Sequence, residues 1–175
     1  MFTSNPFSEL SASIPTIVMQ AYIILMILMV IGGTVLDMIH KKSAQYFFEN
    51  AKKAEKNAKR SVGTGEKASI AVQVLVNEVL TSGEFCNVKR RLSHLLTMYG
   101  FILFVATTAI MIFAYPTPAT PTPAILPLLW HIGALMLAIG GYWFWFFIRV
   151  DVSAEGLSWY RFERADLFIV SLLGT

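Results

Sequence analysis

The stretch Ile14–Leu36, IPTIVMQAYIILMILMVIGGTVL, contains no Asp, Glu, Lys, Arg or His. As an α-helix it would extend for roughly 34 Å, which exceeds the ~30 Å hydrocarbon core of a bilayer. The segment therefore predicts a first membrane-spanning helix, assigned to residues 14–39. We expect it to be retained rather than cleaved as a signal peptide. No Lys or Arg precedes it, and the apolar run is longer than a signal core.

Two further apolar segments predict spans at residues 94–115 and 124–148. The first stops at Pro116 and the second at Arg149. The loop between them, residues 116–123, reads PTPATPTP and carries four prolines and no charge. Because alternating prolines cannot continue a helix, this loop predicts a short, extended connection between antiparallel neighbours.

The composition supports an all-α, multi-pass membrane protein with three transmembrane helices. Of the 175 residues, 55% are hydrophobic and only 14% are charged, whereas a soluble domain has about a quarter charged residues. The single cysteine, Cys86, excludes an intrachain disulfide. It also excludes a zinc site of Cys ligands, or an iron–sulfur cluster, held by this chain alone.

The basic residues predict the orientation of the chain. Eleven of the fourteen Lys and Arg residues fall within residues 41–91, and the other three follow the third span. Because basic loops remain in the cytoplasm, the connection 40–93 and the loop 149–166 are predicted to be cytoplasmic. The N-terminal segment 1–13 and the loop 116–123 are predicted to lie outside the cell membrane.

The apolar segment 167–175 is too short to span a bilayer, since as a helix it reaches about 14 Å. It is either an interfacial or re-entrant piece or the start of an incomplete fourth span. We expect a stub that docks against the helices of a partner.

The cytoplasmic connection 40–93 predicts two helices. In residues 43–60, Phe and Ala recur at three- and four-residue spacing on one side, and lysines occupy the other. Residues 66–80 are apolar over much of a helix circumference. The pair is either a platform for a soluble partner subunit or two helices held on an anionic membrane surface by lysines.

Three histidines are candidate haem ligands, because imidazole suits haem iron and ionisable residues in spans are usually functional. His40 ends the first span and His94 opens the second, both on the predicted cytoplasmic side. Their matching depth allows one b-type haem held by both imidazoles. The alternative is that both are interfacial residues among basic neighbours. His131 lies seven residues into the third span from the outer side, so it pairs with neither.

The surroundings of His131 leave three roles open. Small residues at helical spacing from it predict a close helix contact and place His131 toward the bundle: Ala134, Ala138 and Gly141. There it would bond a carbonyl or hydroxyl on a facing helix, ligate haem with a partner's residue, or bind a quinone headgroup. The aromatic run 142–147 predicts an interfacial anchoring belt, with a quinone pocket as the alternative.

Residues 77–175 resemble a known family of membrane domains. The motifs are Val-Leu-Thr-Ser-Gly-Glu-Phe-Cys-Asn-Val-Lys-Arg-Arg-Leu-Ser-His-Leu-Leu-Thr-Met-Tyr-Gly-Phe at 79–101, Ala-Thr-Thr-Ala at 106–109, and Gly-Leu-Ser-Trp-Tyr-Arg-Phe at 156–162. They resemble the membrane domain of the quinone-interacting membrane-bound oxidoreductase complex that serves adenylylsulfate reductase. That domain is similar to the gamma (cytochrome b) subunit of respiratory nitrate reductase.

The resemblance implies a b-type haem, electron exchange with quinone, and contact with iron–sulfur proteins on the cytoplasmic side. It implies that His94 is the cytoplasmic-side haem ligand, and it gives no role to His40 or His131. The family's own iron–sulfur domain is missing, because the chain has one cysteine. This departure indicates a reduced form, like a membrane anchor of adenylylsulfate reductase.

The sequence therefore predicts a non-catalytic membrane-anchor subunit of a respiratory or sulfur-metabolism electron-transfer complex. Its expected partners are a cytoplasmic redox enzyme or iron–sulfur subunit, other membrane subunits and the lipid bilayer. Its expected cofactors are haem b and quinone. The alternative is a non-redox anchor or assembly protein that recruits a soluble enzyme. Lysines beside a membrane require no nucleic acid to explain them, so none is expected as a partner.

Overall fold

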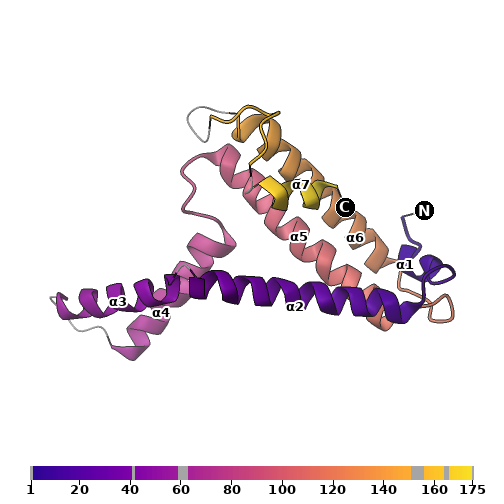
Figure 1. Ribbon diagram of the computed structural model, residues 1–175, viewed down its shortest axis with the longest axis horizontal. Helices are drawn as coiled ribbons and strands as arrows, with labels where there is room; N and C mark the ends of the chain where they lie inside the picture. The colour runs from indigo at the N-terminus through magenta and orange to yellow at the C-terminus, as the bar shows by residue number, and fades with distance from the viewer. Residues whose placement is uncertain (1, 41, 59–62, 151–155, 164–165, 175) are drawn as a thin grey trace. The chain divides into compact units, whose positions relative to one another are not determined.

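The computed structural model describes residues 2–40, 42–58, 63–150, 156–163 and 166–174. Every regular element within these ranges is helical, as the composition predicts. The chain divides into two compact units, one of Met1–Ser13 with Val74–Thr175 and one of Ile14–Gln73 (Figure 1). Four of the basic residues used to predict the orientation lie outside the described ranges: Lys41, Lys59, Arg60 and Arg164.

Three helices are long and apolar enough to cross a membrane, so the chain is a multi-pass membrane protein. They are α2 (Thr16–His40), α5 (Val88–Ala114), and α6 (Ile125–Trp143) continued by the π-helical turn η2 (Phe144–Ile148). The predicted spans agree with them except that α5 begins six residues early. Asn87 explains the early start, because its side-chain oxygen caps the helix by accepting from the backbone N–H of Lys89 at 2.9 Å.

The unit Ile14–Gln73 contains α2, α3 (Ser43–Lys56) and nearly all of α4 (Thr64–Val74). Between α2 and α3, Lys42 adopts the left-handed conformation with φ 52°, which ends the first helix. On α3 and α4, Glu55 and Lys67 form an exposed ion pair at 3.6 Å. After α4 the chain forms a second π-helical turn, η1 (Leu75–Leu80), which belongs to the other unit.

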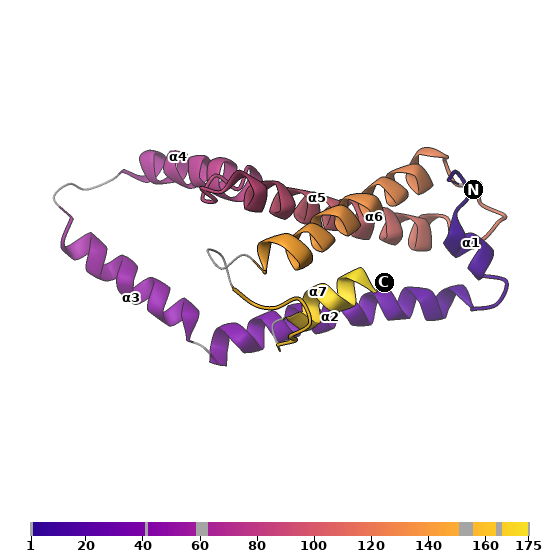
Figure 2. The same ribbon diagram turned by 90° about the horizontal axis from the view of Figure 1, so that it is seen from above.

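Helices α5 and α6 form the core of the larger unit and lie side by side in both views (Figure 1, Figure 2). Their backbones meet at glycines. A Cβ placed on Gly100 would lie 2.9 Å from the carbonyl oxygen of Gly133, and one on Gly140 would lie 2.8 Å from the backbone nitrogen of Thr97. The Ser93 hydroxyl donates to the Gly140 carbonyl at 2.8 Å. Small residues therefore set the register of the helix pair.

The predicted small-residue stripe is only partly the one used. Ala134, Ala138 and Gly141 were expected to line the close helix contact with His131. The closest backbone contacts with α5 are made by Gly133 and Gly140, the sequence neighbours of Ala134 and Gly141. Gly141 faces α7 (Leu167–Leu173), where an added Cβ would lie 2.7 Å from Leu173 Cδ2. The C-terminal apolar segment 167–175 thus contacts α6 of its own chain.

A short helix closes the other end of the α5–α6 pair. Asn5 caps α1 (Pro6–Leu10) by accepting from the backbone N–H of Phe7 at 3.0 Å. Its side-chain amide also donates to the Tyr115 carbonyl and to the Thr122 hydroxyl, each at 3.0 Å. One buried asparagine therefore fastens the N-terminal segment to both ends of the proline-rich loop.

We predict that Gly140→Ala destabilises the protein in detergent by about 1–3 kcal/mol, because the new methyl group would overlap the α5 backbone. Gly33→Ala is the matched control, since a Cβ there has no neighbour within 4 Å. Thermal unfolding followed by circular dichroism measures both variants. An equal loss of Tm in the two variants would contradict the close-contact model.

Candidate functional site

His94 lies on the face of α5 that points away from α6. Its neighbour Ser93 is buried against α6, whereas His94 is exposed. The His94 ring contacts the ring of Phe85, with centroids 5.0 Å apart and planes inclined by 53°. The Arg90 guanidinium lies 5.5 Å from the Phe85 centroid on the same surface. Phe85, Arg90 and His94 form what we call the His94 surface.

The turn that carries Phe85 is held firmly to α5. The Tyr99 hydroxyl donates to the Leu80 carbonyl at 2.6 Å, and Arg91 Nε donates to the Thr81 carbonyl at 2.7 Å. Ser82 is buried at φ 50°, and Gly83 N–H donates to the Asn77 carbonyl at 2.8 Å. These bonds fix the path of the chain between η1 and α5. They therefore fix the position of Phe85 beside His94.

The segment before this turn leaves apolar side chains uncovered. The four apolar residues of η1 are exposed: Leu75, Val76, Val79 and Leu80. Cationic residues follow closely at the start of α5: Lys89, Arg90 and Arg91. Exposed apolar residues that lie outside the spans and close to cationic residues are suited to contact with a partner protein. The contact surface of that partner would combine apolar residues with carboxylates.

The α5–α6 register separates His94 from His131. His94 is level with Gly140, as the bond from Ser93 to that residue shows. His131 is level with Thr108, since the neighbouring Trp130 donates from Nε1 to the Thr108 hydroxyl at 3.0 Å. The distance along α5 from residue 94 to 108 is roughly 20 Å. One haem cannot be shared by these two imidazoles.

His131 has an assigned partner and a defined tautomer. Its Nδ1 lies 2.7 Å from the carbonyl of Pro127 on its own helix, not on a facing one. Because a carbonyl only accepts, Nδ1 is the donor in this contact, and Nε2 is the acceptor of the neutral imidazole. The half-buried ring makes edge contacts with Phe2 at 5.0 Å and Trp130 at 4.9 Å. A backbone bond of this kind is typical of histidines that ligate a metal with the other nitrogen.

His40 is the last residue of α2 and is exposed. It belongs to the unit Ile14–Gln73, whereas His94 and His131 belong to the other unit. Within the described ranges no three His, Cys, Asp or Glu side chains gather as a metal site. Axial ligation of haem requires only two imidazoles.

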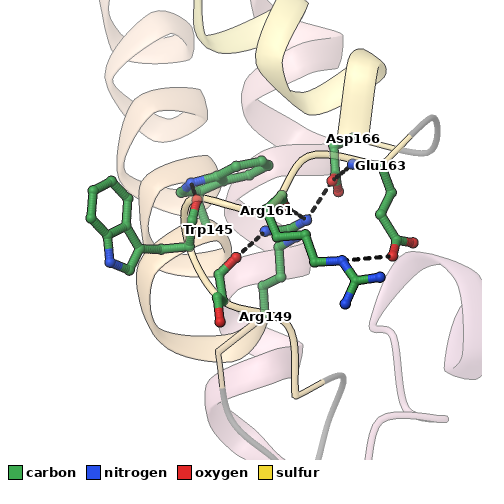
Figure 3. Close-up of polar contacts among 7 residues, drawn as sticks. Trp145, Arg149, Arg161, Glu163 and Asp166 are labelled. Carbon is green, nitrogen blue, oxygen red and sulfur yellow. Dashed lines mark hydrogen bonds and ion pairs between the residues drawn. The ribbon is translucent and has the colours of Figure 1, made fainter.

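A buried ion pair between Arg149 and Asp166, which sequence reasoning missed, lies at the end of the third span (Figure 3). Arg149 is 0% exposed, and its guanidinium lies 4.3 Å from the Trp145 ring. It donates to the carbonyls of Ser158 and Arg161 and pairs with the Asp166 carboxylate. Asp166 also accepts from the backbone N–H of Glu163 at 2.6 Å. We call this group the Arg149 latch; it ties the loop after the span to its last turn.

The aromatic run 142–147 contains both buried and exposed residues. Trp145 is buried, donates from Nε1 to the Trp159 carbonyl at 3.1 Å and contacts the Phe162 ring at 5.4 Å. Tyr142, Phe146 and Phe147 are exposed. Exposed aromatic side chains at a span end are typical of an interfacial belt.

Comparisons of the chain with protein-family models, curated proteins and solved structures find no match.

We predict that Asp166→Asn destabilises the protein by about 3 kcal/mol, because Arg149 keeps its buried charge and loses the carboxylate. Glu163→Gln is the control, since the substitution keeps the backbone of Glu163 and removes an exposed side-chain ion pair with Arg161 at 3.9 Å, whose loss costs less than about 1 kcal/mol. Thermal unfolding followed by the fluorescence of Trp145 and Trp159 measures the stability of both variants. A smaller effect for Asp166→Asn than for Glu163→Gln would refute the structural role of the latch.

Proposed function

We propose that the protein is a non-catalytic membrane-anchor subunit of a respiratory or sulfur-metabolism electron-transfer complex. In this proposal it docks a cytoplasmic redox enzyme or iron–sulfur subunit and assists electron exchange with membrane quinone through a b-type haem. The observation that carries the proposal is the uncovered His94 imidazole on a firmly held surface, within the segment that resembles the cytochrome b-like family.

His94 fits the requirements of an axial haem ligand. A ligand nitrogen must be accessible, and its ring must be held in a constant orientation. The exposure of His94 supplies the first requirement, and the contact with Phe85 supports the second. A bound b-type haem would supply one-electron transfer. The second imidazole would come from His40 or from another membrane subunit, and His131 would serve a separate site for a quinone headgroup rather than ligate this haem.

The surface beside His94 supports docking of a partner. The exposed apolar residues of η1 and the basic start of α5 present hydrophobic area and positive charge together. A protein with an apolar patch rimmed by carboxylates complements such a surface. In the proposed orientation this surface is cytoplasmic, so the docked subunit would lie close to His94.

A second candidate function is a non-redox anchor or assembly protein that recruits a soluble enzyme. The observation that favours it is the same η1 surface, which can hold a partner without any haem. The two candidate functions therefore differ in whether His94 ligates a haem, and both use η1 to dock a partner.

Replacement of His94 separates the two functions. We expect membranes that contain the wild-type protein and its partners to show a b-type reduced-minus-oxidised spectrum. His94→Ala should remove most of this absorption, because a haem that loses an axial imidazole is released or changes its spin state. His131→Ala is the matched control and should retain it, since His131 lies roughly 20 Å away along the bundle.

Absence of haem absorption from the wild-type complex would contradict the redox proposal. If the partner still copurifies with that complex, the non-redox anchor is the correct function. If Val79→Glu in η1 leaves copurification unchanged, docking at η1 is wrong under either function.

The proposed orientation can be tested with the native cysteine. Cys86 is exposed and lies in the basic connection. We expect a membrane-impermeant maleimide to label Cys86 in inside-out vesicles and not in intact cells, because positively charged loops stay in the cytoplasm. Cys86→Ser serves as the unlabelled control. Labelling in intact cells would reverse the orientation.

A further inference from the structure

Helix α3 has an apolar face that no described residue covers. Phe47 and Phe48 are 69% and 62% exposed, and their rings contact each other at 5.5 Å in an edge-on arrangement. Ala51 and Ala54 are exposed on the same side at helical spacing. The face therefore combines two large aromatic side chains with small residues between them.

The opposite face of α3 carries lysines without carboxylate partners. Lys52, Lys53 and Lys56 are exposed, and none forms an ion pair with a described residue. The two acidic residues of the helix are already engaged. Glu49 accepts from the Gln45 amide at 3.0 Å, and Glu55 pairs with Lys67 at 3.6 Å. The helix thus presents a net positive charge that its own unit does not neutralise.

The position of α3 in the chain keeps it close to the membrane. It begins at Ser43, three residues after α2 ends at His40. The left-handed conformation of Lys42 prevents α3 from continuing α2 as one helix. A helix tethered this closely to the end of a span starts within the interfacial region of the bilayer.

We propose that α3 binds the surface of an anionic phospholipid bilayer. Phe47 and Phe48 enter the boundary between headgroups and acyl chains, and the lysines lie over the headgroup phosphates. This is the arrangement of amphipathic helices that lie in the membrane interface. Charge complementarity and the short tether to α2 select an anionic lipid surface over a protein partner. The proposal does not depend on haem binding or on docking at η1.

The experiment uses single cysteines on the two faces of α3, in the Cys86→Ser background. Ala51→Cys lies on the apolar face. Glu49→Cys lies two residues earlier and therefore on the opposite face, since helical residues are about 100° apart. Each full-length variant is labelled with an environment-sensitive fluorophore. It is then placed in nanodiscs of phosphatidylcholine, either alone or mixed with an equal amount of phosphatidylglycerol.

We expect the label at position 51 to show blue-shifted emission and to resist quenching by aqueous iodide, while the label at position 49 remains quenched. The protection should be greater in the phosphatidylglycerol nanodiscs. Adding the substitutions Lys52→Gln, Lys53→Gln and Lys56→Gln should remove this lipid dependence, with surface occupancy falling about fivefold per lysine.

Three results would overturn the proposal. Equal quenching at the two positions would show that α3 does not lie on the lipid surface. Equal protection in the two lipid mixtures would show that anionic headgroups are not recognised. Protection of position 51 that does not fall when the three lysines are replaced by Gln would show that these lysines do not hold α3 on the anionic headgroups.

Discussion

The larger unit depends on the close backbone contact between α5 and α6. In a bilayer, lipid chains surround apolar side chains as well as a neighbouring helix does, so burial of leucine or phenylalanine gives little drive for association. The two helices instead associate through van der Waals contact between their backbones, which approach closely at Gly100, Gly133 and Gly140. The bond from Ser93 to Gly140 adds a polar contact at the same interface. The register set there fixes the depths of His94 and His131.

The two ends of this helix pair are closed in different ways. At one end, Asn5 uses its side chain both to cap α1 and to bond the loop that joins the helices. At the other end, Arg149 gathers two backbone carbonyls and the Asp166 carboxylate. Each closure satisfies backbone groups that a short loop cannot pair by itself. The consequence is a helix pair whose connecting segments are held by single polar side chains.

Much of the fold follows from hydropathy and loop composition. The three spans, the two helices of the basic connection and the short C-terminal helix all lie where the sequence places them, because long apolar runs and proline-rich loops have few other structures available. Sequence reasoning missed that α5 begins at Val88, although Asn87 directly before the polar first turn of this helix is a recognisable N-cap. Gly133 and Gly140 were not singled out beside Ala134, Ala138 and Gly141, because periodicity alone does not tell which face of a helix meets a neighbour. The Arg149 latch required the path of the loop 156–163, which sequence spacing does not provide.

The burial of Arg149 has a consequence for the way in which the chain enters the membrane. In the proposed orientation, this arginine is a hydrated cation while the third span is being inserted, and its charge would favour retention of that end in the cytoplasm. Once the loop folds over it, the guanidinium is enclosed by Trp145, Asp166 and two carbonyls. In that orientation the same residue would first favour the topology as a charge and then belong to the folded interior, where it is 0% exposed and no longer adds to the surface charge.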